Sequence, residues 1–272
     1  MSFLRLKNLR KKINTSPESK IRIARFLAMC GISSRRKCEQ IILEGRVKIN
    51  GQTITDLSDK VSPDDEVKID DKPVNFEKTT VIAVNKPPGF ISTASDKFER
   101  KIVLDLVPGS IQRLYPVGRL DMDSRGLIIL TNDGDLAYRL THPKFGIEKV
   151  YDVLINGKIN RNDLKKISEG IDVEGRELHP AGVELIDNSY GDENSYKRYR
   201  NREGSSSFIR IKISEGRKRI IRKVFKLLGY DVLDLKRIQI GNFKLSDYRS
   251  ELSEGKYKIL NSREIKKLTE KS

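Results

Sequence analysis

Residues 116–130 read PVGRLDMDSRGLIIL, and this stretch places charged residues directly before an apolar run. Two aspartates and two arginines lie between Gly118 and Gly126, and four consecutive apolar residues follow at 127–130. Glycines around a polar segment are typical of a tight loop, and a short apolar run is typical of a buried strand. The sequence therefore predicts a charged loop at the edge of a sheet, a common location for a functional site.

The loop aspartates, Asp121 and Asp123, also have a structural interpretation. A loop aspartate commonly forms an Asx turn or pairs with a nearby arginine, and in an arbitrary loop this is the commoner role. The loop alone therefore leaves a structural and a catalytic interpretation open.

The chain from residue 81 onward has the pattern of a sheet with helices. Residues 208–213 alternate between apolar and polar side chains, which favours an antiparallel or mixed sheet with one covered face. The polar segment 188–206 predicts an extended loop. Strands are expected at residues 81–84, 127–130, 150–155, 181–186, 207–213 and 232–240, and helices at residues 135–140, 162–169 and 217–228.

A smaller helix–helix–strand module is predicted before this sheet. Residues 21–28 have helical spacing and end before Gly31, and Ser33 or Ser34 can cap a second helix that runs to Leu43. Strand-like residues follow, with a turn at residues 50–51. We expect a basic tail at residues 1–20, this module at 21–72, a linker at 73–80, the sheet domain at 81–260 and a polar tail at 261–272.

The charge of the chain restricts its partners. Its 272 residues include 54 Lys and Arg against 38 Asp and Glu, a formal net charge of +16, which predicts a polyanionic partner. Apolar runs stay well short of the roughly 20 residues of a membrane span, and no signal-peptide pattern opens the chain, so we expect a cytoplasmic protein without membrane contact. Neither a zinc cluster nor a disulfide framework is indicated by Cys30, Cys38, His142 and His179.

Residues 215–229 form a second informative segment. Ile220, Val224 and Leu228 have the helical spacing of a core-facing stripe, and six basic residues occupy the remaining surface. A solvated basic face is the simplest interpretation, but six cations on three turns repel one another. An anionic partner or a buried carboxylate is therefore favoured.

Four segments, taken in their order along the chain, resemble the motifs of the bacterial ribosomal pseudouridine synthases, the branch that modifies small- and large-subunit rRNA. Residues 21–70 likewise resemble the small alpha-L RNA-binding module found in a ribosomal protein and in tyrosyl-tRNA synthetases. The matching segments are NKPPG at 85–89, GRLD at 118–121 with GL at 126–127 and TNDG at 131–134, KVYDV at 149–153, and EGRKRIIR at 215–222 with Leu235, Arg237 and Gly241 beyond.

The resemblance implies an α+β fold, in which the alpha-L module precedes a mixed, mainly antiparallel sheet with flanking helices. It implies an isomerase that converts one uridine of rRNA to pseudouridine without any cofactor. Large-subunit (23S) rRNA is favoured by the pattern at residues 34–36 and 45–47, with small-subunit (16S) rRNA as the alternative. A non-catalytic ribosome-assembly factor is a further alternative, which Asp121 in a complete motif disfavours. The expected partner is rRNA or a ribosome-assembly intermediate, and the chain is expected to be a monomer.

The resemblance also implies roles for individual residues. Asp121 would be the nucleophile or base, Tyr151 would stack on the uracil and Arg222 would pair with Asp121. A half-buried strand residue is the structural alternative for Tyr151. Serine at 124 and isoleucine at 220 depart from the threonine and the polar residue that are usual there. Further substrate contacts are expected from Arg119, Leu235, Lys86, Arg217 and Arg219, and RNA contacts of the module from Arg22, Ser34, Arg35, Arg36, Arg46 and Lys48.

Overall fold

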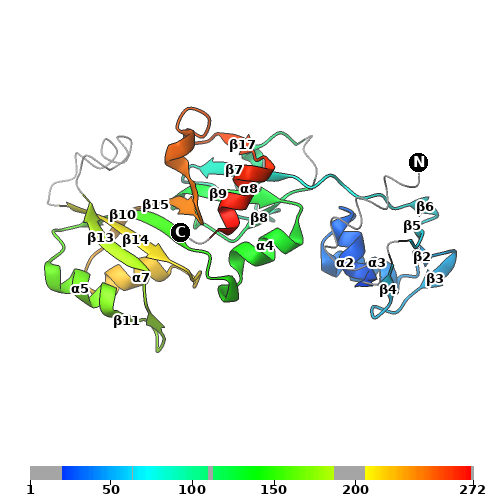
Figure 1. Cartoon of the computed structure of the whole chain (residues 1–272), viewed down its shortest axis with the longest axis horizontal. Coiled ribbons are helices and arrows are strands. Elements are labelled where there is room, and N and C mark those ends of the chain that lie inside the picture. The colour runs from blue at the N-terminus through cyan, green and yellow to red at the C-terminus, as the bar shows by residue number, and fades with distance from the viewer. Residues whose placement is uncertain (1–19, 63, 110–112, 187–205, 271–272) are drawn as a thin grey trace. The chain divides into compact units, whose positions relative to one another are not determined.

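The computed structural model describes residues 20–62, 64–109, 113–186 and 206–270. The expected basic tail, apart from Lys20, and nearly all of the expected loop at 188–206 lie outside these residues. The chain divides into two compact units, Met1–Thr79 and Thr80–Ser272, each of which has its own core (Figure 1).

The N-terminal unit combines two helices with a small antiparallel sheet. Ser34 accepts a hydrogen bond from the Lys37 backbone N–H, which confirms it as the cap of the second helix. The first helix begins at Ile23 rather than at residue 21, because the two preceding residues pair with a strand. Its elements are β1 (Ile21–Arg22), α2 (Ile23–Met29), α3 (Arg35–Leu43), β2 (Val47–Ile49), β3 (Gln52–Ile54), β4 (Lys60–Val61), β5 (Val67–Ile69) and β6 (Lys72–Pro73).

The segment expected as a linker is partly packed into this unit. Pro73 lies in β6 and pairs with Lys68, and Val74 is buried in the core of the unit. The Phe76 ring makes an edge-on contact with Phe26, with 5.2 Å between ring centroids. Apolar residues at alternate positions therefore continue the module, and the two units separate between residues 79 and 80.

The C-terminal unit is built on one large sheet. Its strand order is β13-β14-β10-β15-β9-β7-β17, with β16 beside β15 and β8 beside β9. The pairing of β9 with β15 is parallel and the other pairings are antiparallel, which confirms the predicted mixed, mainly antiparallel sheet. The strands are β7 (Val81–Lys86), β8 (Tyr115–Val117), β9 (Arg125–Thr131), β10 (Lys149–Asn156), β13 (Gly182–Ile186), β14 (Ser206–Ile213), β15 (Val232–Ile240), β16 (Phe243–Lys244) and β17 (Tyr257–Ile259).

Helices cover both faces of the central strands, whereas the sequence predicted one covered face. Alternate residues of β9 enter two separate cores: Ile128 and Leu130 on one side, Leu127 and Ile129 on the other. The helix α7 packs on the first side, and α4 and α8 pack on the second (Figure 1). The helices are α4 (Gly134–Thr141), α5 (Arg161–Glu169), α7 (Ile220–Leu227) and α8 (Ser262–Thr269), and a hairpin of β11 (Ile171–Asp172) and β12 (Glu177–Leu178) follows α5.

The C-terminal residues form the helix α8, so the prediction of a polar tail at 261–272 is wrong for residues 262–269. Asn261 accepts hydrogen bonds from the backbone N–H groups of Arg263 and Glu264, and the Glu264 carboxylate accepts from the Asn261 N–H. This capping box starts the helix, and Leu268 is fully buried in the second core. The prediction failed because the segment is mostly polar and its apolar stripe is narrow.

We predict that Leu268→Ala lowers the free energy of unfolding of the C-terminal unit by about 2–5 kcal/mol, because it leaves a cavity in a buried core. The matched control is Lys266→Ala on the exposed face of the same helix, for which we expect a change below about 0.5 kcal/mol. Urea titration followed by circular dichroism measures both. Equal stability of the two variants would show that α8 does not contribute to the core.

Candidate active site

The loop that carries Asp121 connects β8 to β9, which pair with each other. Gly89 and Ser92, which follow β7, bind this loop on both sides of Asp121. The Gly89 N–H donates to the Met122 carbonyl at 2.7 Å. The buried Ser92 hydroxyl donates to the Leu120 carbonyl at 2.7 Å and accepts from the Leu120 N–H at 3.0 Å. The backbone of Asp121 is therefore fixed by bonds to the residue before it and the residue after it.

Gly126, the second residue of β9 after this loop, allows β9 to approach β15 closely. Gly126 has a φ of +103° and pairs with Arg237 in the parallel register. A Cβ atom at this position would lie 2.2 Å from the Arg237 carbonyl oxygen, so no other residue fits without displacing a strand. The glycine thus places the Asp121 loop at the end of the pairing between β9 and β15.

Four charged residues form an ion cluster at the loop. Arg219 Nη1 lies 3.5 Å from Asp121 Oδ2 and 3.7 Å from Asp123 Oδ1. Arg222 Nη2 lies 3.0 Å from Asp123 Oδ2. The expected pairing of Arg222 with Asp121 is therefore wrong for this structure, in which Arg219 pairs with Asp121.

The start of α7 explains this exchange of partners. The helix expected at 217–228 begins at Ile220, because Arg219 adopts the left-handed conformation with a φ of 55°. Arg222, one turn into the helix, donates to the Val232 carbonyl at 3.0 Å and to the Ser124 hydroxyl at 3.4 Å. These contacts hold its guanidinium on the Asp123 side of the loop.

The two carboxylates remain accessible. The side chain of Asp121 is 25% exposed and that of Asp123 is 49% exposed, whereas that of Arg222 is 12% exposed. Arg119 is exposed on the same loop. The loop therefore presents both carboxylates to solvent, Asp121 beside the exposed Arg219 and Asp123 beside the largely covered Arg222.

Apolar side chains of β10 and β15 belong to the same core as the residue before Asp121. In the pairing of β10 with β15, Tyr151 lies opposite Arg237 and Val153 opposite Leu235, so these side chains share one face of the sheet. Tyr151 and Leu235 belong to the same buried core as Leu120, the neighbour of Asp121. Tyr151 is 8% exposed, so it is more buried than the half-buried strand residue of the structural alternative.

Arg237 contacts Tyr151 and was assigned no role by the sequence. Its guanidinium is buried, donates to the Leu127 carbonyl at 2.6 Å and lies 3.4 Å from the Tyr151 hydroxyl. Its Nη2 atom has no hydrogen-bond partner among the described residues. The sequence offered two signals for Arg237: its place among the residues that carry the family resemblance, and a charged side chain in the middle of the predicted strand 232–240.

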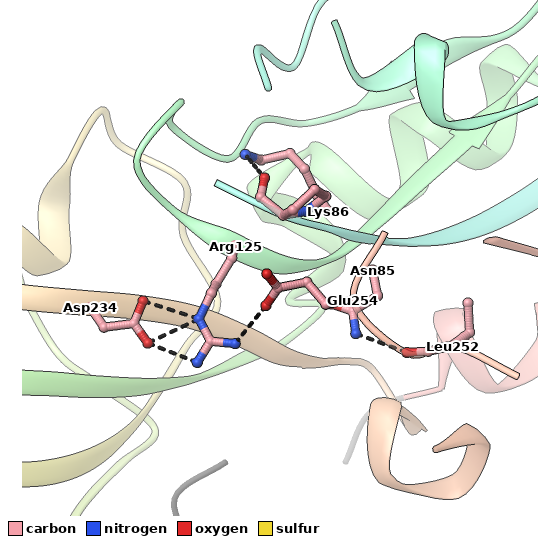
Figure 2. Close-up of polar contacts among 7 residues, drawn as sticks. Asn85, Lys86, Arg125, Asp234, Leu252 and Glu254 are labelled. Atoms are coloured by element: carbon pink, nitrogen blue, oxygen red, sulfur yellow. Dashed lines mark hydrogen bonds and ion pairs between the residues drawn. The ribbon is translucent and has the colours of Figure 1, made fainter. Parts of the chain in front are cut away.

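Lys86 and Arg217, which were expected to contact substrate, are engaged within the protein. Lys86, drawn in Figure 2, is fully buried. Its ammonium donates to the carbonyls of Pro87 and Phe90. Burial lowers the pKa of its ammonium to about 8, against the opposing attraction of Asp123 and Asp121. Arg217 pairs with Glu215 and donates to three carbonyls in the hairpin region 173–177. Both side chains support the loops around the site.

A buried ion network supports the beginning of β9. Arg125 is 2% exposed, and its guanidinium binds both carboxylate oxygens of Asp234 on β15 and one oxygen of Glu254 at 3.1 Å (Figure 2). Removing one partner of such a network leaves an uncompensated buried charge, which costs several kcal/mol. This network could not be predicted from the sequence, because Asp234 and Glu254 are both more than 100 residues from Arg125 and neither belongs to the quoted motifs.

Two further features concern possible ligands and membranes. Among residues 20–62, 64–109, 113–186 and 206–270, no group of three or more His, Cys, Asp or Glu side chains is arranged to hold a metal ion. None of the helices in those ranges has the length and hydropathy of a membrane span.

The sequence and fold match those of known RNA-modifying enzymes. The family model described as RNA pseudouridylate synthase matches residues 80–227, and the S4 domain model matches residues 21–67. A crystal structure of a pseudouridylate synthase aligns with a TM-score of 0.62 at 29% identity, covering 91% of this chain and 99% of that chain. The chain therefore belongs to the RNA pseudouridine synthase family, whose members are isomerases, and carries an N-terminal S4 domain.

Individual relatives share most of their length with the chain. An uncharacterised RNA pseudouridine synthase of Aquifex aeolicus is 38% identical over 250 residues, which are 91% of this chain and 93% of the relative. Ribosomal large subunit pseudouridine synthase B of Bacillus subtilis is 35% identical over 247 residues, which are 91% of this chain and 95% of the relative. The family resemblance and the isomerase class expected from the sequence are thereby confirmed.

The buried ammonium of Lys86 predicts a specific dependence of stability on pH. Its pKa is about 8 in the folded chain against an ordinary value of 10.5, so between these values the unfolded chain binds more protons at this position. The contribution of Lys86 to the free energy of unfolding therefore rises with pH across this window, by up to about 3 kcal/mol.

We predict that the stability difference between the wild type and Lys86→Met changes by about 2–3 kcal/mol in favour of the wild type from pH 7 to pH 10.5. Lys149, whose pKa is also lowered to about 8 by burial, is present in both proteins and cancels in the difference. Urea titrations at the two pH values provide the measurement. A difference independent of pH would show that Lys86 titrates as an exposed lysine does.

Proposed function

We propose that this isomerase converts one uridine of large-subunit (23S) rRNA to pseudouridine, as a cytoplasmic monomer acting on rRNA or on a ribosome-assembly intermediate. The observation that carries the proposal is Asp121, an accessible carboxylate on a loop fixed on both sides, beside a cation and a largely buried aromatic face. The similarity to the large-subunit enzyme of Bacillus subtilis supports the choice of rRNA. Small-subunit (16S) rRNA is the alternative substrate.

The reaction assigns a defined task to Asp121. The bond between C1′ of the ribose and N1 of uracil breaks, a bond between C1′ and C5 forms, C5 loses its hydrogen and N1 gains one, so the composition of the RNA is unchanged. The carboxylate of Asp121 acts as nucleophile or base in opening the first bond. Arg219, 3.5 Å away, orients this carboxylate by ion pairing. Arg222 fixes the loop through Asp123.

The apolar face beside Asp121 provides a place for the base. Chemistry on a base inside a helix requires the nucleotide to leave the stack, and an aromatic or apolar wall stabilises it outside. Tyr151 supplies the aromatic ring and Leu235 the apolar wall, and Arg237 holds the Tyr151 hydroxyl. Arg119, exposed on the Asp121 loop, contacts the RNA around the displaced nucleotide. This placement excludes water from the base while C5 remains near the carboxylate.

We predict that Asp121→Asn abolishes isomerisation and leaves RNA affinity within a few-fold of the wild type, because the amide keeps the size and polarity of the side chain but not its reactivity. The matched control is Asp231→Asn, at an exposed aspartate that pairs with Lys226. Single-turnover conversion of unmodified large-subunit rRNA transcript, mapped by chemical labelling of pseudouridine, measures both. Turnover by Asp121→Asn would sink the assignment, and conversion of a small-subunit transcript alone would select the alternative substrate.

The S4 domain supplies a basic surface for RNA backbone. Residues 21–50 contain seven basic residues against two acidic ones. The structure neutralises part of this charge, because Arg46 pairs with Asp70 and Glu44 and Lys48 pairs with Asp71. Arg36 and Lys37, exposed at the start of α3, make no ion pair within the described part of the unit. We assign the phosphate contacts primarily to these two residues, and secondary contacts to Arg22, Ser34 and Arg35.

We predict that the double variant Arg36→Ala and Lys37→Ala binds RNA more weakly and with a flatter salt dependence. Each lost phosphate contact on single-stranded RNA lowers the slope of log K against log salt by about 0.7, so the expected change is about 1.4. The control is Lys48→Ala, whose partner Asp71 already neutralises the charge and for which we expect a smaller change in slope. Fluorescence anisotropy over a salt series provides the slopes. Equal slopes for both variants and the wild type would exclude this surface from the RNA contact.

A further inference from the structure

The loop after β7 displays an aromatic side chain that the proposed chemistry does not use. Phe98 is 78% exposed, the highest exposure among the large apolar side chains of the described residues. Single exposed apolar residues are common on protein surfaces, so exposure alone is not evidence of a binding site. Phe98 differs from such residues in the construction of its turn and in the place where the turn is attached.

A largely covered carboxylate gives the turn a defined conformation. The side chain of Asp96 is 9% exposed and accepts hydrogen bonds from the backbone N–H groups of Phe98 and Arg100. The same carboxylate binds the Arg100 guanidinium at 2.6 and 3.0 Å, and these bonds lower the pKa of Asp96 to about 2. Phe98 is therefore held outward by its own turn.

The turn combines aromatic rings with cations. The Arg100 guanidinium lies 5.1 Å from the centroid of the Phe98 ring, and Lys101 lies 5.8 Å from that of Phe90 at the base of the loop. Lys97 and Lys101 are exposed on either side of Phe98. Aromatic platforms with neighbouring cations are the elements with which proteins bind single-stranded nucleic acid.

The base of the loop that carries the turn is attached to Leu120, the residue before Asp121. Ser92, which clamps Leu120, lies six residues before Phe98, so the two are at most about 20 Å apart along the chain. The Ile91 N–H donates to the Lys101 carbonyl, and the Val103 N–H donates to the Ile91 carbonyl, which closes the base of the loop. A strand of RNA that places a nucleotide at Asp121 therefore passes within reach of this turn.

We propose that Phe98 stacks on an unpaired RNA base close to the target uridine, and that Lys97 and Lys101 bind the adjoining phosphates. This inference rests on the RNA-modifying activity of the family and not on the choice of large-subunit rRNA. Tyr138, the other large aromatic residue exposed in the part of this unit that the structure describes, is a weaker candidate, because its ring already contacts those of His142 and Phe145 and the Lys144 ammonium. The one ring contact of Phe98 among the described residues is Arg100.

The composition of the chain allows a direct test. The sequence contains no tryptophan, so Phe98→Trp introduces a single indole fluorophore at the proposed stacking position. We expect this variant to bind an unmodified large-subunit rRNA transcript as tightly as the wild type, with strong quenching of its fluorescence on binding. The matched control is Leu185→Trp, at a position 56% exposed on β13, where we expect little quenching at the same occupancy.

Two further variants separate stacking from folding. Phe98→Tyr keeps the ring and should retain wild-type affinity, whereas Phe98→Ala should lose about 5- to 150-fold in RNA affinity, the range of one base–aromatic stack. Turnover of both variants at saturating RNA should stay close to that of the wild type, because Phe98 lies outside the machinery at Asp121.

The outcomes distinguish this inference from the proposed substrate. Quenching by a small-subunit transcript alone would overturn the choice of large-subunit rRNA and support stacking at Phe98. Unchanged fluorescence with RNA bound, or wild-type affinity of Phe98→Ala, would overturn the stacking role. Quenching by neither transcript under conditions of tight binding would point to a protein partner for this turn and likewise overturn the inference.

Discussion

The close parallel contact between β9 and β15 is the constraint on which the site depends. Gly126 lets the two backbones meet, and the buried pairing of Arg125 with Asp234 links the same strands one residue earlier. The Asp121 loop precedes β9, and Leu235 and Arg237 lie on β15. The contact between β9 and β15 therefore aligns Asp121 with Leu235 and Arg237, although the two segments are more than 100 residues apart.

Much of this arrangement could be predicted from local sequence. The charged loop between two glycines, the apolar run after it and the alternation at 208–213 correctly predicted strands around a functional loop. The stop at Gly31 and the cap at Ser34 correctly placed the helices of the N-terminal unit. These features depend on backbone preferences and periodicity, which act over a few residues and are visible in a single chain.

The features that the sequence did not predict depend on distant contacts. The pairing of Arg219 with Asp121 follows from a left-handed residue at the start of α7, whereas helical spacing alone extended the helix through residue 217. The carbonyls that bind Lys86 are only one and four residues away, but its burial beside the Asp121 and Asp123 carboxylates depends on packing against a loop more than 30 residues further along the chain. The helix α8 has a polar composition, and the role of Leu268 is visible only in the structure, where it packs into the second core.

The separation of the C-terminal unit into two cores divides its sequence into regions with different freedom to change. Core residues on the side of α4 and α8 form a cluster separate from that of Tyr151, so volume and hydrophobicity are the main restrictions on them. Core residues on the side of α7 include Leu120, Tyr151 and Leu235, so a change there alters the candidate site as well as the packing. Homologous enzymes can therefore diverge on the face of the sheet that α4 and α8 cover, where substitutions adapt stability to temperature. The face that α7 covers is restricted by the candidate site as well.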